Sequence, residues 1–176
     1  MDDKSVIELV TSSVEDTQHI GELIGQRLHA GDVVALSGEL GSGKTTLIQG
    51  IARGVGHESN RMKSPTFVLV REYPGDIPIV HVDGYRLAGA AAAAWLDLDL
   101  LFSAQKITFI EWAERFADVL PVDHLVITLA HVSTNRRRIT ITATGPRSAA
   151  IVAQCQEMAV SASTSESSED NGRSRD

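Results

Sequence analysis

Residues 38–45, GELGSGKT, constrain the fold more than any other stretch, because they fit the pattern G-x-x-x-x-G-K-[ST]. Gly41 and Gly43 lack a Cβ, so the backbone can curve tightly enough for successive N–H groups to surround a phosphate. Lys44 adds a fixed positive charge, and the hydroxyl of Thr45 can bind Mg²⁺. The residues predicted to hold the phosphates are Gly38, Gly41, Ser42, Gly43, Lys44, Thr45 and Thr46.

The segments on either side of this loop predict a strand before it and a helix after it. Residues 32–37 are mostly apolar, and residues 46–52 carry an apolar helical face. A helix that begins at the loop adds its own N–H groups and dipole to a phosphate site. This order predicts an α/β, three-layer P-loop nucleotide-hydrolase fold, in which helices flank a mainly parallel sheet with antiparallel strands added. The alternative for the loop alone is a glycine-rich hairpin without a ligand.

The rest of the chain alternates between strand and helix patterns. Ser12 and Glu15 fit a capping box, which predicts a helix that begins at Ser12 and stops at Gly31. The last two strand patterns are separated by a polar turn and predict an antiparallel pair beside the parallel centre. Further strands are predicted at residues 6–10, 68–73, 77–83, 106–111, 124–131 and 137–144, and helices at 44–54, 88–102 and 113–119.

Length and composition predict a single domain at residues 1–145, the P-loop nucleotide-hydrolase domain, followed by a C-terminal tail at residues 146–176. The tail predicts a short helix at 148–160 and then a serine-rich disordered segment. The sequence predicts no signal peptide and no membrane span, hence a cytoplasmic protein. The net charge of −7 argues against direct binding to a nucleic-acid backbone, so any contact with RNA would run through a partner.

Two predicted strands end in acids, Asp83 and Glu111. In a parallel sheet the carboxyl ends of the strands face the ligand, so both acids are expected near the phosphates. Glu111 follows the more continuously apolar strand and is favoured as a Mg²⁺ ligand with Thr45, which leaves Asp83 to orient the attacking water. The alternative for each acid is a strand-end turn residue. His81, on the same face as Asp83, is interpreted as a half-buried histidine satisfied by its neighbours.

Two further segments leave alternatives open. Pro65 makes the turn at residues 64–67 stiff, and Thr66 within it either faces the γ-phosphate as a switch or simply opens a strand. The three arginines 136–138 form either a solvated rim or one contact to a nucleotide. The chain has no Asn-Lys-x-Asp element for guanine and no Leu-Ser-Gly-Gly-Gln signature of transport ATPases.

Four stretches form a combination that is more specific than the phosphate loop alone: residues 38–46 (GELGSGKTT), 64–67 (SPTF), 81–87 (HVDGYRL) and 110–114 (IEWAE). Together they resemble the bacterial TsaE family, P-loop ATPases of tRNA threonylcarbamoyladenosine biosynthesis. The similarity in order and spacing extends from about residue 10 to 144.

The resemblance implies ATP and Mg²⁺ as ligands, with Thr45 and Glu111 at the metal. It implies that Lys44, Asp83 and Thr66 take part in catalysis, with Thr66 in a switch-like segment. The adenine side of the family corresponds to Val14, Thr17 and Arg136 in this chain. The family acts with TsaB and TsaD, so tRNA would be reached only indirectly, and hydrolysis would be weak without these partners.

Two other functions stay open from the residues alone. One is a small-molecule or nucleoside kinase, in which Asp83 would deprotonate an acceptor hydroxyl. The other is a nucleotide-gated binding module with negligible hydrolysis, in which residues 64–67 report the γ-phosphate to a partner.

Overall fold

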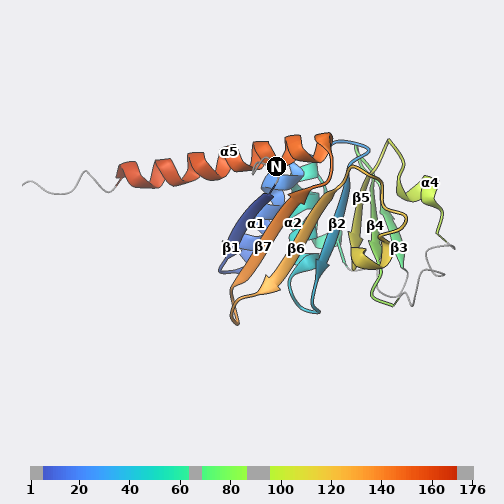
Figure 1. Cartoon of the computed structure of the whole chain (residues 1–176), viewed down its shortest axis with the longest axis horizontal. Helices are drawn as coiled ribbons and strands as arrows, with labels where there is room; N and C mark the ends of the chain where they lie inside the picture. The colour runs from blue at the N-terminus through green and yellow to red at the C-terminus, as the bar shows by residue number, and fades with distance from the viewer. Residues whose placement is uncertain (1–5, 64–68, 87–95, 170–176) are drawn as a thin grey trace, which may run out of the picture.

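A computed structural model describes residues 6–63, 69–86 and 96–169, and its centre is a seven-stranded sheet with helices on both faces (Figure 1). The strands are β1 (Val6–Thr11), β2 (Val33–Gly38), β3 (Val70–Tyr73), β4 (Ile79–Asp83), β5 (Ile107–Glu111), β6 (Leu125–His131) and β7 (Arg137–Ala143). The α-helices are α1 (Val14–Gly25), α2 (Lys44–Val55), α4 (Leu98–Leu101) and α5 (Pro146–Glu169). Two 3₁₀ helices are η2 (Ser59–Arg61) and η3 (Ala113–Phe116).

The sheet has a parallel centre with antiparallel edges, in the order β1-β7-β6-β2-β5-β4-β3. Strands β6, β2, β5 and β4 run parallel, whereas β7, β1 and β3 join as antiparallel strands. The predicted α/β fold is confirmed. One detail differs from the prediction of an antiparallel pair beside the parallel centre. Strand β6 pairs in parallel with β2 and so belongs to the centre, and β7 pairs with β6 in the antiparallel direction.

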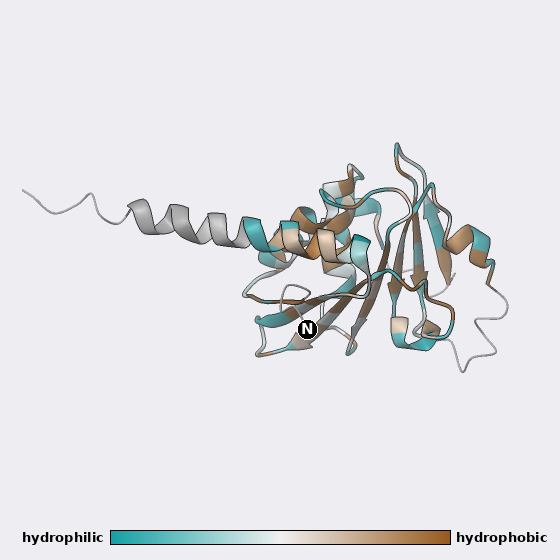
Figure 2. Ribbon diagram, turned by 45° about the horizontal axis from the view of Figure 1, so that its top comes forward, coloured by the Kyte–Doolittle hydropathy of each residue, from teal (hydrophilic) through white to brown (hydrophobic). Residues whose placement is uncertain are grey.

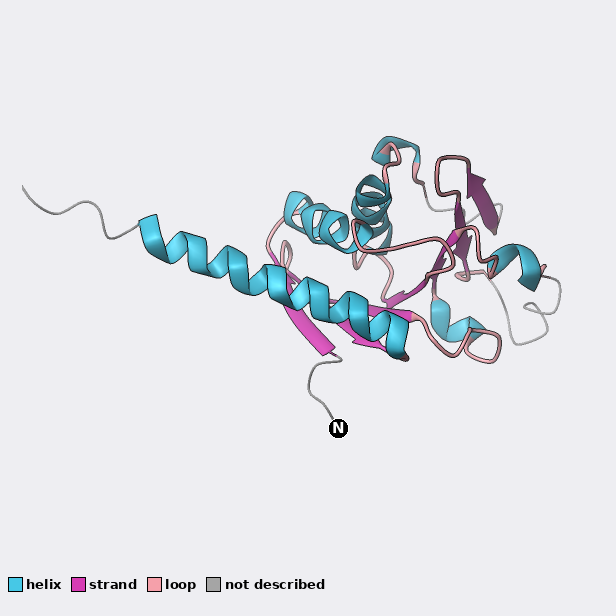
Figure 3. Cartoon of the chain, turned by 90° about the horizontal axis from the view of Figure 1, so that it is seen from above, coloured by secondary structure: helices cyan, strands magenta, loops and turns pink. Residues whose placement is uncertain are grey.

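The central strands are buried on both faces. In β2, Val34 and Leu36 belong to the larger core beneath α1, α2 and α5, whereas Val33 and Ala35 belong to a smaller core beneath α4 and η3. Figure 3 shows α1 and α2 on one side of the sheet and η3 on the other. A strand covered on both faces favours apolar side chains along its length, which is why β2 and β5 are mostly apolar (Figure 2).

Helices α1 and α2 lie against each other at four glycines, Gly21, Gly25, Gly50 and Gly54. A Cβ on any of them would lie less than 3.0 Å from backbone of the facing helix, which real Cβ atoms essentially never do. The close approach fixes the start of α1 beside the start of α2. The glycines in these helices are therefore a packing requirement, although glycine weakens an isolated helix.

Helix α1 begins one residue later and ends earlier than the sequence patterns predicted. Its N-cap is Ser13, whose side chain accepts from the Asp16 N–H, while the Asp16 carboxylate accepts from the Ser12 N–H at 3.0 Å. The prediction of Ser12 and Glu15 as the capping pair was therefore wrong by one residue. The helix also ends at Gly25 instead of continuing to Gly31, which has a φ of +94° in the turn before β2.

Helix α5 is longer than predicted and is joined to the core. It begins at Pro146 and runs to Glu169, whereas a helix over 148–160 was expected. Ile151 and Val152 are buried in the larger core, so the first turns of α5 pack with the sheet although they follow the expected boundary at residue 145. In Figure 1 the far half of α5 projects beyond the sheet. No helix among the described residues is long and apolar enough to cross a membrane.

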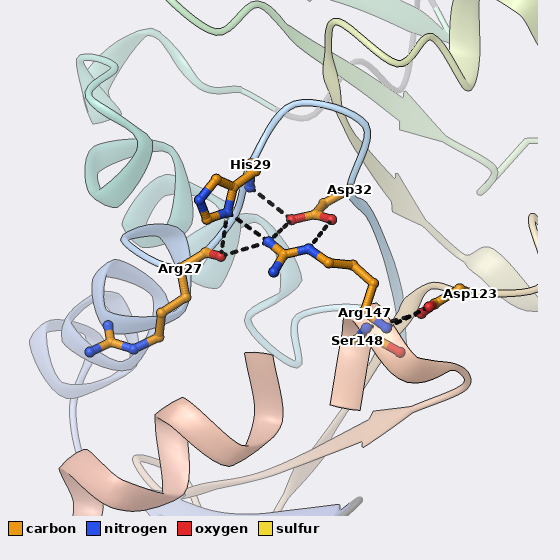
Figure 4. Close-up of polar contacts among 6 residues, drawn as sticks. All are labelled: Arg27, His29, Asp32, Asp123, Arg147 and Ser148. Carbon is orange, nitrogen blue, oxygen red and sulfur yellow. Dashed lines mark hydrogen bonds and ion pairs between the residues drawn. The ribbon is translucent and has the colours of Figure 1, made fainter. Parts of the chain in front are cut away.

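Polar contacts fix the first turn of α5 to two loops (Figure 4). The Arg147 guanidinium donates to both carboxylate oxygens of Asp32, at 3.0 and 2.8 Å, just before β2. The Asp123 carboxylate accepts from the backbone N–H groups of Arg147 and Ser148, at 2.7 and 3.0 Å. Burial raises the pKa of Asp123, but its hydrogen bonds with Ser148 and Arg147 outweigh this, so the pKa lies below its ordinary value.

We expect Gly25→Ala to lower the free energy of unfolding by about 1–3 kcal/mol, because its Cβ would overlap the Ile51 carbonyl oxygen. Without this overlap the same change inside a helix would stabilise the protein by about 1 kcal/mol. Urea unfolding measures the difference. Gly56→Ala is the control, since nothing lies within 4 Å of its Cβ position and only its left-handed backbone opposes the change. A stabilised Gly25→Ala variant would contradict the packing argument.

Candidate functional site

The loop at residues 38–45 joins β2 to α2, and its glycines adopt backbone conformations that other residues rarely take. The φ angles of Gly38, Gly41 and Gly43 are +148°, +75° and +104°. A Cβ on Gly38 would also overlap the Leu129 carbonyl oxygen of β6. Gly43 is the N-cap of α2, so the loop runs straight into the N-terminus of that helix. The fold thus sets the glycine-rich loop and a helix N-terminus together, as an anion site requires.

Lys44 is buried beneath the loop, with its ammonium group held by backbone carbonyls. Its Nζ donates to the Gly38 and Glu39 carbonyl oxygens at 2.7 and 2.9 Å. The ammonium also lies 4.3 Å from the centre of the Trp112 ring, a cation–π distance. Burial lowers the pKa of Lys44, and the negative charges of Glu111, Glu114 and Asp83 oppose that shift.

The two predicted acids lie side by side at the carboxyl edge of the sheet. Asp83 and Glu111 are register partners on β4 and β5, and each is only 3% exposed. The Thr45 hydroxyl donates to Glu111 Oε1 at 3.0 Å. Asp83 Oδ1 accepts from the Tyr85 backbone N–H at 2.8 Å. Parallel pairing therefore brings both acids to the first turn of α2.

A cavity of about 350 Å³ opens between the loop and these acids. The cavity is lined by the Thr45 hydroxyl and by the carboxylates of Asp83 and Glu111. Mg²⁺ prefers oxygen ligands of these kinds in proteins. Within the described part of the chain, no three His, Cys, Asp or Glu side chains cluster as a metal site. The cavity is lined by Leu40, Gly41, Gly43, Lys44, Thr45, Thr46, Asp83, Tyr85, Glu111 and Trp112.

A smaller hollow of about 70 Å³ adjoins the loop on the side of α1. Val14 and Thr17, predicted for the adenine side, both line it. The arginine that lines it is Arg137. Its Nε lies 3.6 Å from the position that a Cβ on Gly43 would occupy. Arg136 is exposed in the turn before β7. The hollow is lined by Ser13, Val14, Thr17, Gly41, Gly43, Thr46 and Arg137.

The strand alternation explains why Arg137, and not Arg136, reaches the hollow. Because β7 begins at Arg137, this residue shares a face with the buried Ile139 and Ile141, which lie beneath α1 and α2. Arg138 lies on the other face and pairs with Glu8 of β1 at 3.2 Å. The alternation of residues 137–141 is the sequence signal that places Arg137 on the face of the hollow, whereas the role of Arg136 at the nucleotide stays a prediction.

One side chain near the cavity, His81, differs from its interpretation in the sequence. His81 is fully buried, not half-buried, and its Nε2 lies 2.9 Å from Glu111 Oε1. Trp112 lies against Lys44 and has a left-handed φ of 58°. Its ring lies 5.2 Å from that of Tyr85. Thr66, the predicted switch residue, lies outside the described residues.

The fold and the loop define a P-loop architecture, and comparison with known proteins names the family. The family model described as "Threonylcarbamoyl adenosine biosynthesis protein TsaE" matches residues 11–139. The chain therefore belongs to the TsaE family.

Individual relatives agree with that assignment. The chain is 37% identical over 138 residues to the TsaE protein of Bacillus subtilis, which covers 78% of this chain and 85% of that protein. It is 43% identical over 135 residues to the TsaE protein of Mycobacterium tuberculosis, covering 72% and 80%. The crystal structure of Bacillus subtilis YdiB superposes with a TM-score of 0.74 at 31% identity, covering 88% of this chain and 96% of that one.

The lowered pKa of Lys44 predicts how stability changes with pH. Between the folded-state pKa and the ordinary value of 10.5, the unfolded chain binds more protons at Lys44 than the folded chain does. The free energy of unfolding should therefore rise with pH in that window, by at most about 1.4 kcal/mol per unit. Urea unfolding of the wild type and of Lys44→Met isolates this term, because other groups cancel in the difference. A difference that stays flat or falls toward pH 10.5 contradicts the prediction.

Proposed function

We propose that this chain binds and hydrolyses ATP with Mg²⁺ in support of tRNA threonylcarbamoyladenosine biosynthesis, assisting TsaB and TsaD without carrying out the transfer. The observation that carries the proposal is the contact between the Thr45 hydroxyl and the Glu111 carboxylate, 3.0 Å apart beside a glycine-rich loop. The names of the relatives place those proteins in tRNA threonylcarbamoyladenosine biosynthesis. Family membership supports the same role here.

The phosphates of ATP would lie in the larger cavity, against the N–H groups of the loop and of the first turn of α2. Lys44 would exchange its carbonyl contacts for phosphate oxygens, since its Nζ already lies within the loop. Thr45 and Glu111 would hold Mg²⁺, which neutralises the charge that develops on the phosphate oxygens. Asp83, next to Glu111, is the residue proposed to orient the attacking water.

The adenosine part of the nucleotide would lie in the smaller hollow. Val14 offers apolar surface there, and Arg137 offers a planar cation that can stack on a base or bind a phosphate. Because α1 and α2 are held together at their glycines, the two parts of the nucleotide would meet one rigid unit. The role of Thr66 as a switch stays a prediction.

Weak hydrolysis without partners follows from the charges at the site. Among the described residues that line the two hollows, the cations are Lys44 and Arg137. An additional arginine supplied by another protein raises the turnover of such sites by about 10³-fold or more. A partner that completes the site is therefore the simplest way to reach useful rates.

Arg137→Ala should weaken ATP binding by about tenfold or more, because a charged hydrogen bond contributes about 1.5–3 kcal/mol. Arg136→Ala is the matched control, since it removes the same charge from the exposed neighbouring position. Isothermal titration calorimetry gives both dissociation constants. A larger loss of affinity in Arg136→Ala than in Arg137→Ala would restore the assignment made from the sequence.

Phosphate release from ATP should increase by at least about tenfold when TsaB and TsaD are added together, well within what a completed site can supply. Asp83→Asn should bind ATP as the wild type does and yet show no stimulation, because the amide replaces one of the two acceptor oxygens that orient the attacking water with an N–H donor. Equal rates with and without TsaB and TsaD would contradict assistance. Transfer of phosphate to an acceptor, with no free phosphate, would indicate a kinase. Full partner function in Asp83→Asn would indicate a nucleotide-gated module.

A further inference from the structure

His81 lies fully buried beside the acid proposed to bind the metal. It belongs to β4, two residues before Asp83, and its register partner on β5 is Phe109. Glu111 is two residues beyond Phe109 and so is the diagonal neighbour of His81 on the same face of the sheet. The distance from His81 Nε2 to Glu111 Oε1 is 2.9 Å. A rigid strand thus aims the imidazole at one carboxylate oxygen.

The chemistry of the pair sets which atom carries the proton. An ionised carboxylate can only accept a hydrogen bond, so Nε2 donates. Among the described residues, Nδ1 has no hydrogen-bond partner, and the ring has no access to solvent. The Nε2–H tautomer therefore makes the hydrogen bond of this buried ring.

The same oxygen of Glu111 accepts from the Thr45 hydroxyl at 3.0 Å, and Oε2 lies 3.4 Å from that hydroxyl. A glutamate side chain has three rotatable bonds and needs fixed contacts to hold one orientation. The Thr45 hydroxyl rotates about its own bond and can release Glu111 when it binds something else, whereas the ring of His81 is held in the core. His81 is consequently the lasting anchor of the carboxylate.

We propose that His81 is a positioning residue that fixes the orientation of Glu111 through Nε2–H, and thereby sets the affinity of the site for Mg²⁺ with a bound nucleotide. This rests on the proposed function, because Glu111 must serve the metal for its orientation to matter. Groups that orient metal ligands typically change metal affinity by about 10–100-fold when they are removed.

The test compares two replacements of the same residue, in the full chain. His81→Leu removes the donor and keeps a buried apolar side chain, whereas His81→Gln can place an amide N–H near the position of Nε2. Calorimetry measures ADP binding in EDTA and across a Mg²⁺ titration. In His81→Leu, the Mg²⁺ concentration that gives half of the Mg²⁺-dependent gain in ADP affinity should rise at least about tenfold. ADP binding in EDTA should be unchanged. His81→Gln should recover most of that loss.

The outcomes separate the inference from the proposed function. If the ADP affinity of the wild type does not depend on Mg²⁺, the result contradicts the proposed metal site itself. A wild type that responds to Mg²⁺, with a His81→Leu variant that responds equally, overturns only the role of His81. So does a loss of the same size in EDTA and in Mg²⁺, which would indicate a purely structural role.

A second measurement does not depend on the folding of any variant. In the ¹⁵N-histidine NMR spectrum of the wild type, the ring of His81 should carry its proton on Nε2. Protonation on Nδ1 alone would leave Nε2 without a hydrogen to donate and would overturn the inference.

Discussion

The site depends on the parallel pairing of β2, β5 and β4, because three parallel strands end at the same edge of the sheet. The loop after β2, Glu111 at the end of β5 and Asp83 at the end of β4 come from distant parts of the chain and meet there. The strands can run side by side only if both faces are covered, which α1 and α2 do on one side and α4 and η3 on the other. The same parallel sheet, covered on both faces, is therefore required both for the core and for the site.

The same edge holds groups that a protein selected for stability alone would avoid. Lys44 is buried with a lowered pKa, two carboxylates lie 3% exposed next to each other, and Trp112 adopts a left-handed backbone. Each lowers stability unless its neighbours compensate. The compensation comes from local contacts: carbonyls to Lys44, and the Thr45 hydroxyl and His81 to Glu111. Such a concentration of destabilising groups is typical of functional sites.

The sequence predicted the parts of the site that are set by local pattern. The loop follows from glycine spacing, and the two acids follow from apolar strands that end in a carboxylate, so the sequence predicted that Lys44, Thr45, Asp83 and Glu111 lie together, as they do around one cavity. The His81–Glu111 contact was not, since it depends on the register between two strands. The position of Arg137 at the smaller hollow was also not predicted, because it depends on the exact residue at which β7 begins. The length of α5 also escaped prediction, because its serine-rich end lacks an apolar face.

The central claim is that the edge between the loop and Glu111 is where Mg²⁺ and ATP bind. The most direct measurement is a crystal structure of the chain with Mg²⁺ and a non-hydrolysable ATP analogue. The account predicts the phosphates against the backbone of residues 41–45, with Mg²⁺ at the Thr45 hydroxyl and near Glu111, and the base beside Val14 and Arg137. Phosphates bound elsewhere, or an analogue bound with Mg²⁺ remote from both Thr45 and Glu111, would contradict it.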